Sequence, residues 1–234
     1  MTTKQLTGNS VLIVGASGGL GSALAGELAR RGARLALLAR DISRLKALPV
    51  DGLRLAADIR NSEACRAAVG RVIEEHGSLD GVINAAGVVA FGPLVGTGDD
   101  VLEALFATDA VGPLRLLRAA LPHMERGFIV NITAVVVEQP LPDMVAYCAA
   151  KGALATATAA LRKELRKQRK DVLIVDARPP HTETGLAGRP IAGHAPKLPK
   201  GLNPRRVAER ILMAVENGET EIPSDAFLKS SRGD

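Results

Sequence analysis

Short apolar runs alternate along the chain with longer segments whose apolar residues recur at helical spacing. The runs predict strands at 10–14, 35–39, 53–57, 81–84, 128–132 and 172–177, with a short last strand at Glu221-Ile222. The intervening segments predict helices at 19–31, 42–47, 61–76, 99–124, 145–169 and 204–217. Strands that alternate with helices indicate an α/β fold, with a doubly wound parallel sheet covered by helices on both faces.

Residues 178–203 interrupt this alternation. They contain five prolines and four glycines, and loops of this length in compact domains tend to serve a binding site or to be disordered. We expect a mobile lid over a substrate or cofactor; a surface loop without a task is the alternative. No other stretch has the composition of a linker, so the 234 residues are predicted to form a single domain, 1–234.

The composition is that of an ordinary globular protein, with 47% hydrophobic and 24% charged residues. Aromatic residues make up only 2%, which leaves little for stacking the bases of single-stranded nucleic acid. The longest nearly apolar run, 128–137, is too short to span a bilayer. Because residues 1–6 lack the apolar stretch of a signal peptide and two cysteines cannot form a disulfide framework, we expect a cytoplasmic protein.

The charge pattern identifies no particular partner. The net charge is +5, but 30 basic and 25 acidic residues are mostly interspersed. A basic run at 162–170 could contact nucleic acid, although cations at the end of a helix also complement its dipole, and we favour that structural role. Four histidines show no zinc-site spacing. We therefore predict no metal, no nucleic-acid partner and no membrane association.

A glycine-rich turn follows the first strand and opens the first helix. The segment Val14-Gly15-Ala16-Ser17-Gly18-Gly19-Leu20-Gly21 lets the main chain approach a pyrophosphate, whose charge the helix N-terminus stabilises. Such turns also use glycine for purely steric reasons, but the flanking strand and helix favour binding. The predicted cradle consists of Gly15, Ser17, Gly18, Gly19 and Leu20.

A second motif, Tyr147-Cys-Ala-Ala-Lys151, lies on the helix at 145–169. Residues four apart share one helix face, so an ammonium can lie near the only tyrosine of the chain. The ammonium would favour the phenolate and lower the tyrosine pKa towards neutrality. The pair could therefore transfer a proton, although such spacing also arises by chance on solvated helices.

These motifs, with Asn84-Ala85-Ala86-Gly87 and Arg178-Pro179-Pro180 to Thr184, resemble the short-chain dehydrogenase/reductase family over nearly the whole chain. The resemblance implies a Rossmann-like three-layer αβα sandwich and hydride transfer between a nicotinamide and a carbonyl or secondary alcohol. It implies that Tyr147 exchanges the substrate proton and that Lys151 also binds the nicotinamide ribose. Family contacts to the cofactor would fall on Asp58, Ile59, Asn84, Ala85, Ala86, Gly87, Pro179, Thr182 and Thr184.

The end of the second strand bears on the choice of cofactor. Arg40 offers a guanidinium fork to a 2′-phosphate, which favours NADP. Asp41 could instead hold a ribose, as in an NAD enzyme, but its position before a helix favours an N-cap. In the same way, Asp58 could simply cap the helix that begins near Asn61 and Asn84 to Gly87 could be only a turn. We expect NADP, with NAD as the less favoured alternative.

The predicted catalytic end departs from the family pattern at several positions. Ala134 occupies the place of a serine that binds the substrate oxygen, and Thr133 can replace it only if the strand bends there. Asp109 replaces an asparagine, so a proton relay through Lys151 would be rewired or Lys151 would be drawn away from the tyrosine. The other departures are Val14, in place of a threonine, and Pro180, in place of a glycine.

We therefore predict an NADP-dependent oxidoreductase with a small carbonyl or alcohol substrate, whose rate Ala134 and Asp109 reduce. A cofactor-binding sensor or interaction protein that has lost most catalysis is the alternative. By resemblance, a homodimer or homotetramer is expected through the helical regions at 99–124 and 145–169.

Overall fold

The computed structural model describes residues 6–229. Residues 1–5, on which the expectation about a signal peptide rests, lie outside the described residues. Seven strands form one parallel sheet in the order β3-β2-β1-β4-β5-β6-β7. Their bounds are β1 Ser10–Val14, β2 Arg34–Ala39, β3 Leu53–Ala56, β4 Gly81–Asn84, β5 Arg126–Ile132, β6 Asp171–Ala177 and β7 Glu221–Ile222.

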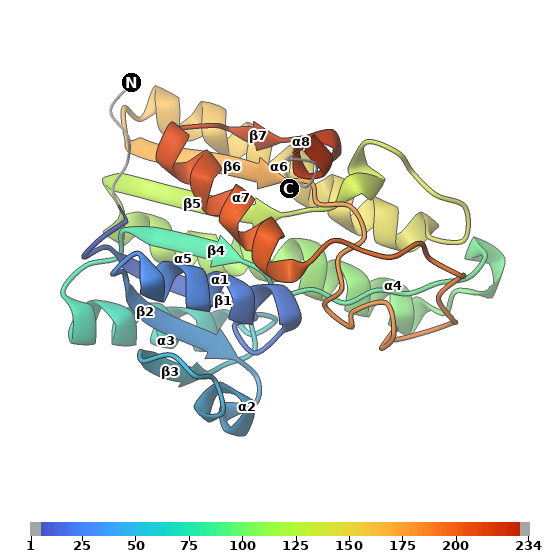
Figure 1. The fold of residues 1–234 in the computed structure, drawn as a ribbon, viewed down its shortest axis with the longest axis horizontal. Helices are drawn as coiled ribbons and strands as arrows, with labels where there is room; N and C mark the ends of the chain where they lie inside the picture. The colour runs from blue at the N-terminus through green and yellow to red at the C-terminus, as the bar shows by residue number, and fades with distance from the viewer. Residues whose placement is uncertain (1–5, 230–234) are drawn as a thin grey trace.

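Helices cover both faces of the sheet (Figure 1). One face packs against α1 (Gly19–Arg30), α7 (Pro204–Asn217) and α8 (Ser224–Lys229). The other packs against α3 (Ser62–His76), α5 (Gly112–Ala120) and α6 (Val145–Lys167). The predicted doubly wound fold is confirmed, because Val11 and Ile13 of β1 join one core while Leu12 and Val14 join the other.

Most predicted elements agree with the structure to within two residues. The predicted helix at 99–124 is the main exception: it divides into α4 (Asp99–Phe106), a π-helical turn at Ala107–Val111, α5 and a 3-10 turn at Leu121–His123. Pro113 explains the break, because proline has no amide hydrogen for the carbonyl of Asp109 and its ring crowds that carbonyl. Helix α2 (Ile42–Lys46) lies where the sequence predicted it. The 3-10 turns at Leu94–Gly96 and Val135–Val137 and helix α8 were not predicted from the sequence.

The strand order reverses between β1 and β4, where the chain first builds outward through β2 and β3 and then returns. Ligands of open parallel sheets bind in the crevice at the carboxyl ends of the strands at such a point. The loop 178–203 (orange) lies beyond these carboxyl ends in Figure 1, near α4. The topology therefore gathers the glycine turn, the ends of β4 and β5 and this loop around one crevice.

Candidate active site

A pocket of about 520 Å³ occupies the crevice, which is within the usual range for ligand sites. Asn84 and Asp109 are the two predicted site residues that do not line it. The predicted residues that do line it are Gly15, Ser17, Gly18, Gly19, Leu20, Arg40, Asp58, Ile59, Ala85, Ala86, Gly87, Thr133, Tyr147, Lys151, Pro179, Thr182 and Thr184. The fold thus brings together nearly all the residues that the sequence motifs selected.

The glycine turn has the geometry of a phosphate cradle. Gly15 has a φ of 77°, and a Cβ there would lie 2.6 Å from the amide nitrogen of Ala86. Any side chain at position 15 would collide with the β4 loop. Helix α1 begins at Gly19, so its first amide groups lack helical partners and face the place of an anion. The turn therefore fits a dinucleotide pyrophosphate.

Two arginines, Arg40 and Arg44, line the pocket near the end of β2. Asp41 is the N-cap of α2: its Oδ1 accepts hydrogen bonds from the amides of Ser43 (2.8 Å) and Arg44 (3.2 Å). Arg44 also donates from Nη2 to the carbonyl of Ser17, at 2.9 Å, which ties α2 to the glycine turn. Arg44 was not among the predicted site residues, although its position one turn after the N-cap was a usable signal.

Asp58 forms a bidentate ion pair with Arg60, and both side chains line the pocket. The Arg60 hydrogen bond holds the pKa of Asp58 below its usual value, and the charge of Arg40 contributes. Asn61, not Asp58, is the N-cap of α3, so the capping alternative for Asp58 is wrong. Arg60 is a second pocket cation that the sequence analysis did not select.

Asn84 lies inside the sheet. Its Nδ2 donates to Oδ1 of Asn131 on β5 at 2.6 Å, and Asn131 in turn donates to Thr158 on α6 at 2.8 Å. These three buried residues connect the ends of β4 and β5 to α6. Asn84 is therefore positioned to hold the strand ends in place and does not line the pocket.

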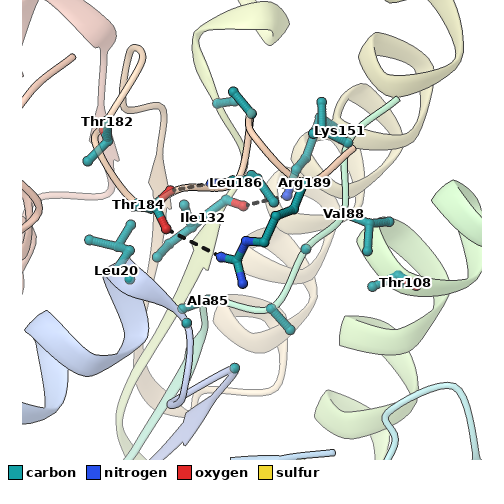
Figure 2. Close-up of a pocket in the computed structure, with 18 of the residues that line it drawn as sticks. Leu20, Ala85, Val88, Thr108, Ile132, Lys151, Thr182, Thr184, Leu186 and Arg189 are labelled. Carbon is teal, nitrogen blue, oxygen red and sulfur yellow. Dashed lines mark hydrogen bonds between the residues drawn. The ribbon is translucent and has the colours of Figure 1, made fainter. Parts of the chain in front are cut away.

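Tyr147 and Lys151 lie together on the face of α6 that lines the pocket, with 7% and 4% of their surfaces exposed. The Lys151 Nζ is 5.9 Å from the tyrosine ring centre and donates to the carbonyl of Ile132 at 3.1 Å (Figure 2). Burial raises the pKa of Tyr147 well above its ordinary value, and the charges of Asp109 and Cys148 raise it further. This direction is opposite to the one expected from the motif, because the loss of water around the buried phenol disfavours its charged form.

The π-helical turn places Asp109 behind the pocket wall, fully buried. Its Oδ1 accepts a hydrogen bond from the amide of Val88 at 2.9 Å, whereas its Oδ2 has no partner among the described residues. A Cβ on Gly87 would be 3.1 Å from Oδ1 of Asp109 and 3.4 Å from Nζ of Lys151. Burial raises the pKa of Asp109 to about 6, against the opposing effect of the Lys151 charge.

The hydroxyl of Thr133 does not offer its proton to the pocket. It donates to Oδ1 of Asp176 at 2.6 Å and also lies 3.2 Å from the carbonyl of Ala177, and the side chain is buried. Asp176 is paired in turn with Arg178. This geometry disfavours the predicted substitution of Thr133 for the serine that Ala134 replaces.

The loop 178–203 is tied to the pocket wall. The amide of Ile191 donates to the carbonyl of Val89 at 2.8 Å, and the amide of Phe91 donates to Ala192 at 3.0 Å. The hydroxyl of Thr182 donates to Pro180, at 2.9 Å, within the same loop. Tyr147 belongs to an apolar cluster of the pocket wall with Val89, Phe91, Val136, Met144 and Leu186. Leu141 and Ile191 also line the pocket.

The basic run at 162–170 is partly built into the fold. Arg162 donates to the carbonyls of Ile174 and Thr220, and Lys170 donates to those of Leu121 and Met124. Arg166 and Lys167 lie in the last turn of α6, where the predicted complement to the helix dipole requires cations. No cluster of three potential metal ligands occurs within residues 6–229. Over the same range, no helix is both long enough and apolar enough to cross a membrane.

A doubly wound sheet, a glycine cradle and a buried Tyr-Lys pair in one crevice together define a dinucleotide-dependent oxidoreductase. The comparisons agree. The family model for the short chain dehydrogenases matches residues 9–192. The chain belongs to this family of NAD(P)-dependent oxidoreductases.

Relatives and solved structures cover most of the chain. The ketoacyl reductase HetN of Nostoc sp. is 31% identical, over 95% of this chain and 79% of its own. A metagenomic short-chain oxidoreductase in complex with NADP is 28% identical, with a TM-score of 0.78 and coverage of 94% and 98%. A short chain dehydrogenase/reductase from Burkholderia phymatum in complex with NAD has a TM-score of 0.85 at 23% identity, over 98% and 93% of the two chains, and shows likeness of fold.

Proposed function

We propose that the protein is an NADP(H)-dependent oxidoreductase that interconverts a carbonyl group and a secondary alcohol. The observation that carries the proposal is the buried pair of Tyr147 and Lys151 in the same pocket as the glycine turn. A bound nicotinamide would supply or accept the hydride. The side chains of the pocket then have to bind the dinucleotide, exchange one proton and exclude water.

Tyr147 is proposed to exchange that proton with the substrate oxygen. Its raised pKa keeps the phenol protonated, which suits the donor role in carbonyl reduction. Lys151 uses one of its three ammonium donors on the carbonyl of Ile132. The other two are proposed to bind the nicotinamide ribose, and the positive charge would stabilise the phenolate left after proton transfer.

Asp109 is proposed as a positioning residue that acts through Lys151. The two charged groups lie close to the same side of Gly87, where a Cβ would be 3.1 Å from Oδ1 of Asp109 and 3.4 Å from Nζ of Lys151. An ionised carboxylate there draws on the positive charge of Lys151 and raises the pKa of Tyr147. The protonated form, which burial favours, removes that competition.

The preference for NADP rests on Arg40 and Arg44. Asp41 is occupied as an N-cap, with its Oδ1 bound to two amides of α2. The Arg40 side chain has no hydrogen bond or ion pair with another residue of the described chain. A 2′-phosphate beside these two guanidinium groups would gain charge-assisted hydrogen bonds, which a ribose hydroxyl would not.

The substrate is proposed to be a small carbonyl compound or alcohol with an apolar body, because apolar side chains surround Tyr147. We also propose a homo-oligomer. Phe106, Val111 and Leu114 on the segment 99–120 and Val145 on α6 expose 37–47% of their surfaces, and burial of these side chains between copies would be favourable.

The proposal is tested by following NADPH absorbance with a panel of apolar aldehydes, ketones and ketoesters, and NADP reduction with the matching alcohols. Steady turnover with a lower KM for NADPH than for NADH is expected. A clear preference for NADH would contradict the role of Arg40. Tight NADPH binding without turnover on any compound would point instead to the cofactor sensor.

A further inference from the structure

Arg189 is a pocket cation for which the mechanism above has no use. It belongs to the loop 178–203, and Figure 2 shows its side chain reaching back across the pocket towards Thr184. Its Nε donates to the carbonyl of Gly185 at 3.0 Å, and its Nη2 to the carbonyl of Thr184 at 3.5 Å. Pro190 follows it and restricts the local backbone.

The guanidinium lies close to the glycine turn. The carbonyl oxygen of Thr184, which Nη2 of Arg189 contacts, is only 2.8 Å from where a Cβ on Gly19 would be. Gly19 is the first residue of α1, the helix whose N-terminal amides face the place of an anion. The cation of the loop and the N-terminus of α1 therefore converge on the same part of the pocket.

The charge of Arg189 is not neutralised by any residue in the described part of the chain. No carboxylate pairs with it among residues 6–229, and its two acceptors are neutral carbonyls of its own loop. A guanidinium has five N–H donors in a planar fork, which matches the oxygens of a phosphate better than single carbonyls. The Arg189 side chain is thus a charged hydrogen-bonding fork that lines the pocket and has no charged partner among the described residues.

We propose that Arg189 binds the diphosphate of the dinucleotide and thereby couples the loop 178–203 to cofactor binding. The inference rests on the proposed function, because it requires a bound dinucleotide. The guanidinium would exchange the carbonyls of Thr184 and Gly185 for phosphate oxygens. The same loop contributes Leu186 and Ala187 to the apolar cluster that contains Tyr147, so the cofactor would order part of the substrate site before the substrate arrives.

Binding measurements on Arg189→Ala, Arg189→Lys and the loop control Lys200→Ala test the contact. Lys200 is an exposed cation that does not line the pocket. Calorimetry is done with the dinucleotide that binds more tightly and with its adenosine fragment without the diphosphate (2′-AMP for NADPH, adenosine for NADH). Arg189→Ala should weaken the dinucleotide by about 10- to 100-fold and change the fragment less than twofold.

Arg189→Lys should recover part of the affinity for the dinucleotide, because it keeps the charge without the fork. Lys200→Ala should bind both ligands as the wild type does. An unchanged dinucleotide affinity in Arg189→Ala would overturn the inference, and so would an equal loss for the fragment.

Limited proteolysis tests the coupling to the loop. Trypsin can cut after Lys197, whereas Pro190 blocks a cut after Arg189. Saturating dinucleotide should slow cleavage after Lys197 at least fivefold in the wild type and in Lys200→Ala. In Arg189→Ala, saturated at a correspondingly higher concentration, this protection should be lost; full protection would overturn the coupling.

The outcomes also separate this inference from the proposed function. A wild-type protein that binds neither NADPH nor NADH would overturn both. Normal wild-type binding with an unaffected Arg189→Ala variant would overturn the inference alone. If Arg189→Ala instead raised only the KM of substrates that carry a carboxylate or phosphate, the arginine would belong to substrate recognition, and the diphosphate contact would be wrong.

Discussion

The two ends of the pocket differ in how far their charged and titratable side chains are exposed to water. At the β2 end, the exposed Arg40 and the neighbouring Arg44 and Arg60 keep their cations near water. At the α6 end, Tyr147, Lys151 and Asp109 are all buried, and burial is the first cause of the raised pKa of both Tyr147 and Asp109. The β2 end is suited to binding an anion. At the α6 end, the protonation of Tyr147 and Asp109 depends on burial and on the charges of neighbouring side chains.

This contrast shows why substitutions at the two ends should differ in kind. Removal of an exposed cation subtracts an interaction with ligand and leaves the rest of the protein intact. A change to a buried titratable group alters the free energy of folding and the pKa of its neighbours together.

Tyr147→Phe should lower kcat by at least about 10³-fold and leave the Kd of NADPH within about twofold, because it removes the proton donor and keeps the ring. Steady-state rates and calorimetry on the same preparation check this. A variant that keeps more than a tenth of wild-type kcat would show that another group supplies the proton.

Asp109→Asn should stabilise the protein at neutral pH. The folded protein binds the Asp109 proton more tightly than the unfolded chain does, with a pKa of about 6 against 3.8. The cost of ionising the buried carboxyl is therefore absent below about pH 4, grows between pH 4 and 6, and reaches about 3 kcal/mol above pH 6. Urea unfolding from pH 4 to 8 should show the gain of the variant growing with pH.

The same variant should lower the pKa of Tyr147, since the charge of Asp109 raises it. For alcohol oxidation, where the phenolate accepts the proton, the rise of kcat with pH should move to lower pH. Glu103→Gln, at an exposed position on α4, is the control and should leave both the profile and the stability unchanged. An Asp109→Asn profile that coincides with the wild type would exclude coupling to Tyr147.

Arg40→Ala should raise the Kd of NADPH by about 10- to 50-fold and change that of NADH less than twofold, because it removes a charge-assisted contact to the 2′-phosphate. Arg66→Ala, an exposed arginine on α3, provides the matched control. If Arg40→Ala raised the Kd of NADPH and that of NADH equally, Arg40 would not bind the 2′-phosphate.

Ala134→Ser should raise kcat by up to about tenfold, as it restores a hydroxyl near the substrate oxygen. The gain should vanish in the Tyr147→Phe background, where proton transfer limits the rate.

Thr133→Val should lower the stability of the protein, since the Thr133 hydroxyl binds Asp176. It should leave kcat, calculated per folded enzyme, nearly unchanged. A loss of about 10²-fold in kcat per folded enzyme would show that Thr133 donates to the substrate oxygen.

Local patterns were sufficient for most of the fold and for the open end of the pocket. The apolar runs predicted the strands to within about two residues, and Asp41 and Asn61 cap α2 and α3 where short polar residues precede a helix. The glycine turn was predictable because position 15 adopts a φ that favours glycine and leaves no room for a side chain. Each of these properties depends on a few neighbours in the sequence.

The buried end was less predictable, because its chemistry depends on residues far apart in the chain. The spacing of Tyr147 and Lys151 predicted their shared helix face, but only packing against the wall near Asp109 reversed the expected direction of the tyrosine pKa. Thr133 gave no sign that Asp176, 43 residues later, would accept a hydrogen bond from its hydroxyl. Arg189 contacts the carbonyl of Thr184, which lies beside Gly19, through a loop whose path no local pattern defines.

The sequence by itself thus determined the parallel α/β fold, the cradle at Gly15 and the Tyr147-Lys151 pair, because backbone preferences and periodic burial are local properties. Which of these groups are exposed to water and which are buried depends on the packing of distant segments. The tertiary structure also decided that Asp109 keeps an unpartnered oxygen and that Arg189 points towards Thr184. Desolvation and charge coupling act through space between distant segments, so they exist only once the chain has folded.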